Sequence, residues 1–462
     1  MRIKGSFVGG LLLALAISLI PVAAISAQII SPGSPCKVFK RKVTNQSKVY
    51  TCIKSGKKLV WNKGVAVVKP TPTPSASPTL SPTPLPAVAT SVLSNLDSYL
   101  NVASCKLING SGQIGVNQSF QQNPFRVRNT KPIRALIFPI DFPDLIGNSD
   151  PLKDFAYVTD GVSDYFKQMS DGKSVFSWTI YPKFVRYGTN VADSNLGGRT
   201  TSGYGTFSSE AMRMAMQTVD TSAYDLIIYA PPITTTRDQI AIGPAFVANS
   251  STQINATMLD GQSYDAKFPY TTAHEIGHLM GLADLYNHGA ANEAAAQPGT
   301  RSANDLQFKY MGIFDLMNWA GGAGVELTAW NRWLIDLIGD DQIRCLPASS
   351  STTLLTPVEV SGGVKGAVVP LSTTEAIVIE SRRALRYDKG MSKTSEGVLV
   401  YKVNTSTSSG SGPMRVVGRA GSADIWLRDA PLKPRERLEV DGYTIEVIES
   451  GEFGDVIKVI KN

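Results

Sequence analysis

The chain has 462 residues, of which 43% are hydrophobic and 18% are charged. This composition is typical of globular proteins and excludes a fibrous or fully disordered chain, while the length predicts two or three folded units. The formal charge of +7 comes from one end, because residues 1–70 contain twelve Lys or Arg and no Asp or Glu. Subtracting these 12 from 45 leaves 33 basic residues against 38 acidic ones, so the bulk charge gives no support for nucleic acid as a partner.

The N-terminus has the pattern of an export signal. Arg2 and Lys4 precede an apolar run at positions 7–22, and small residues follow up to Ala27. We predict a signal peptide over residues 1–27, with an uncleaved membrane anchor as the alternative, although the run is short for a membrane span. No later apolar stretch is long enough to cross a membrane, so we expect a secreted, extracellular or wall-associated protein without a transmembrane segment after cleavage.

Residues 28–68 form a predicted small basic module. Four cysteines suit an oxidising compartment, and their order favours Cys36 with Cys52 and Cys105 with Cys345 among three pairings. Two short strands are predicted around the Ser-Gly-Lys-Lys turn within residues 49–62. The module resembles a small Cys-paired repeat found at the ends of many exported actinobacterial proteins. Its charge favours an anionic cell-envelope polymer or membrane surface as partner, and a solvated Lys-rich surface without a partner is the alternative.

The rest of the chain has three predicted parts. Residues 69–92 alternate Pro with Ser, Thr and Ala, which predicts an extended linker. Residues 93–346 show apolar runs and helical spacing in alternation, which predicts an α/β domain. Residues 347–462 show short apolar runs separated by turn residues, which predicts an all-β, sandwich-like domain, so the fold class is α+β. The strands are expected at 133–142, 175–181, 226–230, 367–371, 376–380, 397–403 and 443–448, and the helices at 158–169 and 206–219.

Two of the three histidines suggest a metal site. His274 and His278 lie four residues apart, so a helix places both imidazoles on one face, within reach of one ion. Glu275 is then placed to act as a general base on a metal-activated water. Gly281 allows a sharp turn out of the helix, and Asp284 can return as the third ligand, which leaves the fourth position open. The alternative is a helix with two unrelated histidines.

Other residues compete for these roles. His288 is a rival ligand, a substrate contact or a loop residue beside the cleft. Glu326 is the alternative third ligand, although Gly281 and Asp284 stand at the expected offsets. No Gly-rich nucleotide-binding loop follows any predicted strand, so the sequence gives no support for phosphate chemistry. A structural Ca²⁺ is not evident from the sequence.

The stretch from His274 to Tyr286 resembles the zinc motif of the immune inhibitor A family of metallopeptidases. The resemblance covers about residues 130–405 and implies a zincin- or metzincin-like fold, with Zn²⁺ bound by His274, His278 and Asp284 and with Glu275 as the catalytic residue. The segment 314–318 is similar to the tight turn whose methionine, here Met317, packs beneath the zinc. A core methionine is the alternative. No long propeptide is evident, unless residues 91–130 serve as one.

The sequence thus predicts a secreted zinc metalloendopeptidase that acts on a protein or peptide substrate, or on glycoproteins or wall peptides. Residues 240–247 are the expected substrate-binding strand or the loop beside it, and Tyr286 is a candidate for stabilising the oxyanion. The alternative is an envelope-binding exported protein with a structural or vestigial metal site. Because structural zinc sites usually have four protein ligands and only three are evident here, we expect the enzyme.

Overall fold

The computed structural model describes residues 31–45, 48–66, 99–197, 202–236, 238–248, 253–258, 270–297 and 301–462. The chain divides into two compact units, residues 1–81 and 82–462. The predicted signal peptide and the predicted Pro-rich linker lie outside the described residues. No helix in the described ranges is long and apolar enough to cross a membrane.

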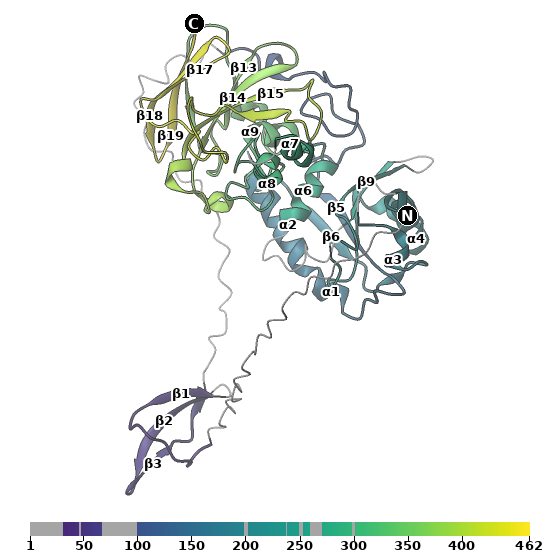
Figure 1. The fold of residues 1–462 in the computed structure, drawn as a ribbon, viewed down its shortest axis with the longest axis vertical. Helices are drawn as coiled ribbons and strands as arrows, with labels where there is room; N and C mark the ends of the chain where they lie inside the picture. Colours follow the sequence, from purple (N-terminus) through teal and green to yellow (C-terminus); the bar gives the residue numbers. More distant parts are fainter. Residues whose placement is uncertain are drawn as a thin grey trace, which may run out of the picture. The chain divides into compact units, whose positions relative to one another are not determined.

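The first unit is a small antiparallel sheet in which β2 pairs with each of the other strands (Figure 1). Its strands are β1 (Lys42–Asn45), β2 (Lys48–Ser55), β3 (Lys58–Trp61) and β4 (Val65–Ala66). The β2–β3 hairpin turns at Gly56, whose φ of +60° favours glycine, and this confirms the predicted turn. The predicted disulfide Cys36–Cys52 is formed. Among the described residues of this unit only Tyr50 and Cys52 are buried, so its apolar core is very small.

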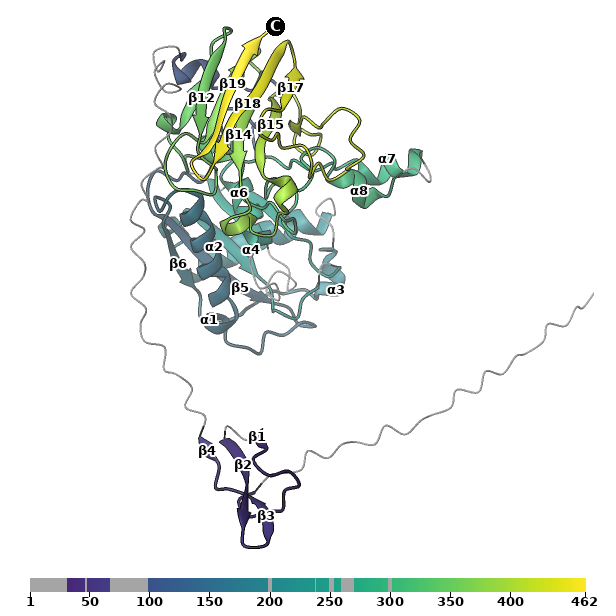
Figure 2. The ribbon, with the colours of Figure 1, turned by 90° about the vertical axis from the view of Figure 1, so that its left-hand side faces the viewer.

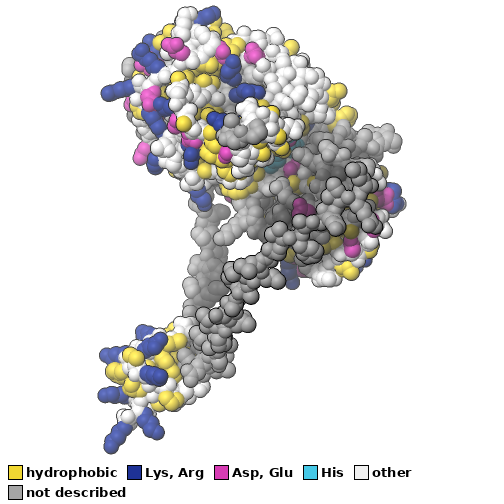
Figure 3. Space-filling model, viewed as in Figure 1, with side chains coloured by type: hydrophobic (Ala, Val, Ile, Leu, Met, Phe, Trp, Pro, Cys, Tyr) yellow, Lys and Arg dark blue, Asp and Glu magenta, His cyan; other side chains and the backbone are white. Residues whose placement is uncertain are grey.

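Basic side chains cover the visible face of this module, with hydrophobic side chains between them (Figure 3). Phe39 is 48% exposed, and the ammonium groups of Lys40 and Lys54 lie 5.7 and 5.9 Å from the centroid of its ring. Because the module has no acidic residue, no ion pair within it neutralises these charges.

The second unit begins with a six-stranded sheet in the order β6-β5-β8-β10-β9, with β7 also paired to β5. All pairs are parallel except β9 with β10, so β9 is an antiparallel edge strand. The predictions for 133–142, 175–181 and 226–230 are confirmed by β5, β6 and β8. The strands are β5 (Ile133–Asp141), β6 (Phe176–Ile180), β7 (Val185–Arg186), β8 (Leu226–Ala230), β9 (Gly243–Ala248) and β10 (Gln253–Met258).

Helices cover both faces of this sheet (Figure 2). Side chains alternate along β5: Leu136 and Phe138 share a core with α4, whereas Ala135 and Ile137 share a core with α2 and α6. The predicted helices are confirmed as α2 and α4. The helices are α1 (Pro151–Asp154), α2 (Ala156–Met169), α3 (Val191–Ser194), α4 (Ser202–Thr218), α6 (Tyr270–Leu279), α7 (Ala290–Ala296), α8 (Ala303–Gln307) and α9 (Ala329–Leu334).

Two further sheets follow, and both belong to the same compact unit. The five-stranded sheet contains β11 (Ile343–Cys345), β13 (Gly366–Pro370), β14 (Glu375–Arg382), β15 (Gly397–Asn404) and β16 (Met414–Val416). The four-stranded sheet contains β12 (Ser351–Leu355), β17 (Arg437–Val440), β18 (Tyr443–Gly451) and β19 (Gly454–Lys461). The four predicted C-terminal strands are confirmed as β13, β14, β15 and β18, and the α+β class is confirmed.

The five-stranded sheet is buried on both faces. On β14, Ile377 and Ile379 pack in a core shared with the four-stranded sheet, whereas Ala376 and Val378 belong to the core that contains α2 and α6. Burial of both faces explains why these strands have nearly continuous apolar sequences. The predicted border between residues 346 and 347 therefore lies within a continuous packed unit. The predicted disulfide Cys105–Cys345 is formed, and it ties residue 105 to β11 of the five-stranded sheet.

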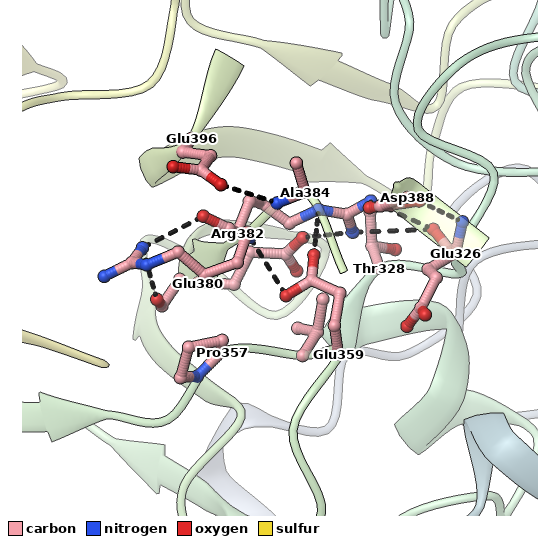
Figure 4. A network of polar contacts seen from close by, with 12 residues as sticks. Glu326, Thr328, Pro357, Glu359, Glu380, Arg382, Ala384, Asp388 and Glu396 are labelled. Atoms are coloured by element: carbon pink, nitrogen blue, oxygen red, sulfur yellow. Dashed lines mark hydrogen bonds and ion pairs between the residues drawn. The ribbon is translucent and has the colours of Figure 1, made fainter. Parts of the chain in front are cut away.

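A buried ion network joins β14 to the loop before α9 (Figure 4). Arg382 is fully buried and contacts three carboxylates: Glu380 at 3.0 Å, Glu359 at 3.4 Å and Asp388. Glu380 also accepts hydrogen bonds from the Ala329 N–H at 2.7 Å and from the Tyr401 hydroxyl at 2.9 Å. The network thereby fixes the start of α9 against the C-terminal strands.

Candidate metal centre

The predicted metal residues of the helix lie on α6, and all are buried. His274, Glu275 and His278 are 7%, 4% and 2% exposed. The Nδ1 atom of His274 lies 3.0 Å from the Leu316 carbonyl oxygen, and the Nδ1 atom of His278 lies 2.8 Å from the Leu282 carbonyl oxygen. When Nδ1 donates its proton to a carbonyl, Nε2 carries the free lone pair, which is the tautomer that a metal ligand needs.

The end of α6 returns the chain to these histidines. Gly281 has a φ of +110°, a backbone conformation that residues with a Cβ rarely adopt, so the turn favours glycine at this position. The Gly281 N–H donates to the His278 carbonyl and the Leu282 N–H to the Gly277 carbonyl, each at 2.9 Å, which closes the helix as a Schellman motif. The sharp turn therefore lies where the sequence predicts it.

Asp284 follows this turn and points between the two imidazoles. Its Oδ1 atom lies 3.2 Å from His274 Nε2 and 3.1 Å from His278 Nε2. One ligand atom from each of these three residues lies within 4.8 Å of the others, and the described residues contain no other such group of His, Cys, Asp or Glu. The structure thus brings together the three residues that the sequence selects.

The donor set suits a divalent zinc ion, which prefers His nitrogen and carboxylate oxygen in fourfold coordination. Two buried atoms at the site, His278 Nε2 and Glu275 Oε2, make no hydrogen bond, although His278 Nε2 lies 3.1 Å from Asp284 Oδ1. Burial opposes the charged form of His278, but the charges of Asp284 and Glu275 outweigh it and raise the pKa of His278 to about 9. Burial also opposes ionisation of Asp284, yet the neighbouring His278, His274 and His288 hold its pKa well below the usual range.

Met317 lies directly beneath the helix. Gly277 stands between His274 and His278 in the sequence, and a Cβ on it would be only 2.7 Å from the Met317 sulfur. The absence of a side chain at Gly277 therefore leaves space for the Met317 side chain against α6. Asp315 begins this turn with a φ of +73°. Its Oδ1 stabilises the turn by accepting a hydrogen bond from the Met317 N–H at 2.8 Å. The same carboxylate accepts the Thr328 N–H at 2.8 Å. This turn also supplies the Leu316 carbonyl that contacts His274, so Asp315 positions a ligand, a role that the sequence analysis missed.

The loop between β15 and β16 contacts Asp284, the candidate third ligand. Ser409 Oγ accepts the Asp284 N–H at 2.9 Å, and the Gly410 N–H donates to the Asp284 carbonyl at 2.9 Å. His288 Nε2 lies 3.0 Å from Asp284 Oδ2, while Asp284 Oδ1 lies close to the other two histidines. His288 therefore contacts the carboxylate from outside the group of three ligand atoms. No local sequence signal could identify Ser409, because 125 positions separate it from Asp284.

The remaining predicted residues are placed as follows. Tyr286 lines a cavity together with His274 and Glu275, and its ring centroid lies 6.2 Å from that of His274. Of the segment 240–247, residues from Gly243 onward form the edge strand β9. Glu326 is fully buried and contacts Arg332 at 2.5 Å, so the structure does not bring it to the histidines.

The segment before β5 supports the end of α6. The Val127 N–H donates to the Leu279 carbonyl at 2.9 Å, the Asn117 N–H to the Gly281 carbonyl at 3.2 Å, and the Arg126 guanidinium to the Met280 carbonyl at 3.1 Å. Residues 117–127 of the segment 91–130 are therefore packed against the end of α6 and the turn that follows it.

Comparison with known proteins gave no family model that matches the chain and no match among curated proteins.

Proposed function

We propose that residues 82–462 form a zinc-dependent endopeptidase. The observation that carries the proposal is the convergence of His274 Nε2, His278 Nε2 and an Asp284 oxygen, with both Nδ1 atoms held by carbonyl groups. The resemblance of residues 274–286 to the immune inhibitor A motif supports the same ligand set, and the position of Met317 beneath α6 supports a metzincin-like arrangement.

His274, His278 and Asp284 would hold the ion. When bound, zinc supplies Lewis acidity, which polarises the scissile carbonyl and lowers the pKa of a water to about 7. Glu275 is buried beside the ligands, lines the cavity, and has an Oε2 atom without a hydrogen-bond partner. This carboxylate accepts the proton of the attacking water and passes it to the leaving amine. Among the described strands β9 pairs only with β10, so it stands at an edge of the sheet, the position at which an extended peptide can add as a further strand.

The test is the substitution Glu275→Gln in the full-length secreted protein. We expect it to retain one zinc ion per chain by elemental analysis and to lose activity on casein by about 10³-fold, because a general base contributes roughly 10²–10⁴. Glu449→Gln is the matched control, since Glu449 is exposed on β18. Undiminished casein cleavage by the Glu275→Gln protein would contradict the proposal.

A second candidate function is binding to the cell envelope, with a structural metal site. The acid-free surface of the first unit favours it, because such a surface suits a polyanion. Retained zinc without hydrolysis of any protein substrate would favour this function over the peptidase.

A further inference from the structure

The cavity beside Glu275 has an aromatic wall. It has a volume of about 420 Å³, and both Trp319 and Phe308 line it. These two rings stack with centroids 4.9 Å apart and planes 19° apart. Trp426 stacks on Trp319 in turn, at 5.0 Å and 26°. The Phe308 and Trp426 centroids also lie only 6.0 Å apart, at 29°, so the three rings form a cluster in which each ring contacts the other two.

The backbone around Trp319 holds the indole closely. A Cβ on Gly321 would lie 3.1 Å from the indole nitrogen, and a Cβ on Gly322 would lie 3.1 Å from the six-membered ring. The Gly322 N–H donates to the Trp319 carbonyl at 2.9 Å, which closes a tight turn over the ring. On the other side, the Trp426 carbonyl accepts the Ile313 N–H at 3.1 Å, so the loop between β16 and β17 is fixed against the segment that leads to Met317.

The lining is neutral away from the metal centre. Among the described residues that line the cavity, His274 and Glu275 are the only His, Lys, Arg, Asp or Glu residues. The other lining residues are Ile242, Thr271, Tyr286, Gln307, Phe308, Asn318, Trp319, Ala320 and Gly321. A charged substrate side chain would lose water here and, away from His274 and Glu275, would meet no opposite charge on the described wall, whereas an apolar side chain gains contact with the indole.

We propose that this cavity is a specificity subsite for a large apolar side chain, preferably aromatic, on a residue next to the scissile bond. Trp319 determines the preference, and Trp426 is a positioning residue that holds the indole. This inference rests on the proposed peptidase activity and names the substrate class of that site. Trp426 does not line the cavity itself but contacts both lining rings, Phe308 and Trp319.

The experiment measures kcat/KM for full-length zinc-loaded protein on peptides that vary at the two positions flanking the cleaved bond. At one of these positions we expect Phe, Tyr or Leu to be preferred over Ala by about tenfold or more, because aromatic contact and area burial together exceed the 1.4 kcal/mol that a factor of ten needs. Trp319→Leu should reduce the ratio of Phe to Ala several-fold, and Trp426→Ala should reduce it less. Trp319→Phe should retain most of it.

A substitution that adds a charge to the wall tests the subsite more strictly than Trp319→Leu does. Trp319→Glu places a carboxylate on the wall, so the preference at that position should shift from Phe towards Lys and Arg. Trp178→Ala is the matched control, because Trp178 is also partly buried but lies on β6, at the opposite edge of the six-stranded sheet from β9. It should keep the wild-type ratio. Circular dichroism checks the fold of each variant.

A second measurement separates this inference from the proposed activity. Calorimetry on the Glu275→Gln protein measures binding of capped Phe and Ala peptides without turnover. Cleavage without an aromatic preference, or with a preference that Trp319→Leu leaves unchanged, would overturn the subsite and leave the peptidase. Trp319-dependent binding of Phe peptides without any cleavage by the wild type would support the cavity and overturn the peptidase. Equal or absent binding without cleavage would overturn both.

Discussion

The two compact units differ in how their charged side chains are placed. The first unit has nine described Lys and Arg residues, two buried side chains and no acidic residue. In the second unit Arg382 is fully buried among three carboxylates, and the same network reaches the start of α9. The basic side chains of the first unit are accessible to a partner, whereas the buried ion pairs of the second unit stabilise the packing around the candidate metal centre. The difference predicts that a given change will have different effects in the two units.

The largest effect should come from Arg382→Met. It leaves Glu380, Glu359 and Asp388 buried without their cation, and breaking a buried pair in this way costs about 3–5 kcal/mol. We expect a lower denaturant midpoint for the second unit only. Arg437→Met is the control, because its side chain is 65% exposed beside Glu446 and the loss should stay below about 1 kcal/mol. Equal midpoints for the two variants would contradict the structural role of the network.

The Cys36–Cys52 disulfide should contribute a larger share of the stability of the first unit than Cys105–Cys345 contributes to the stability of the second. It spans 16 positions, and such a loop contributes about 3 kcal/mol, which is large for a unit with two buried side chains. In the Cys36→Ser, Cys52→Ser protein, residues 31–66 should be cleaved faster in limited proteolysis, while casein cleavage is unchanged. Ser at both 105 and 345 should instead lower the thermal midpoint of the second unit and leave it folded at 25 °C. If residues 31–66 resist proteolysis without the Cys36–Cys52 disulfide, the sheet of the first unit is stable without this cross-link.

Lys365 should make the stability of the second unit depend on pH. Burial lowers the pKa of Lys365 to about 7, and its ammonium group donates to the Pro357 carbonyl at 3.0 Å. The unfolded chain keeps this proton up to about pH 10.4, so between pH 7 and 10 the unfolded state binds more protons and stability rises with pH. The contribution has a slope of up to about 1.4 kcal/mol per pH unit.

The measurement is urea unfolding of wild type and Lys365→Met at pH 7.5, 8.5 and 9.5. The wild type should gain stability relative to the variant across this series. A constant difference would show that the folded protein keeps Lys365 protonated. Unfolding of the first unit, which has no buried lysine among its described residues, should not follow this dependence.

The smallest effect per residue is expected on the basic surface. Lys40→Glu with Lys54→Glu reverses two charges beside the exposed Phe39 ring and should weaken binding to a phosphate-containing wall polymer by about 1 kcal/mol for each lysine. Co-sedimentation at two salt concentrations measures this, with anionic vesicles as a parallel arm. Lys389→Glu is the control, since Lys389 is exposed on the second unit. Binding that neither the double substitution nor salt changes would contradict a charge-based partner for the module.

Local sequence patterns determined a large part of this protein. The apolar runs predicted β5, β8 and β15 because a strand that is buried on both faces has a nearly continuous apolar sequence, and cysteine order predicted both disulfides. The spacing of His274, His278, Gly281 and Asp284 predicted a site in one place because helix and turn geometry act over fewer than a dozen residues.

Only the tertiary structure decided what surrounds that site. Ser409 contacts Asp284 across 125 positions, and Trp426 stacks on Trp319 from the C-terminal half. No periodicity relates such residues, since their proximity depends on how the five-stranded sheet packs against α6 and α9. The sequence by itself determined the candidate ligands and general base, because these lie within one helix and one turn. The residues that hold the third ligand and shape the cavity were decided by long-range packing, which acts between segments that no local pattern connects.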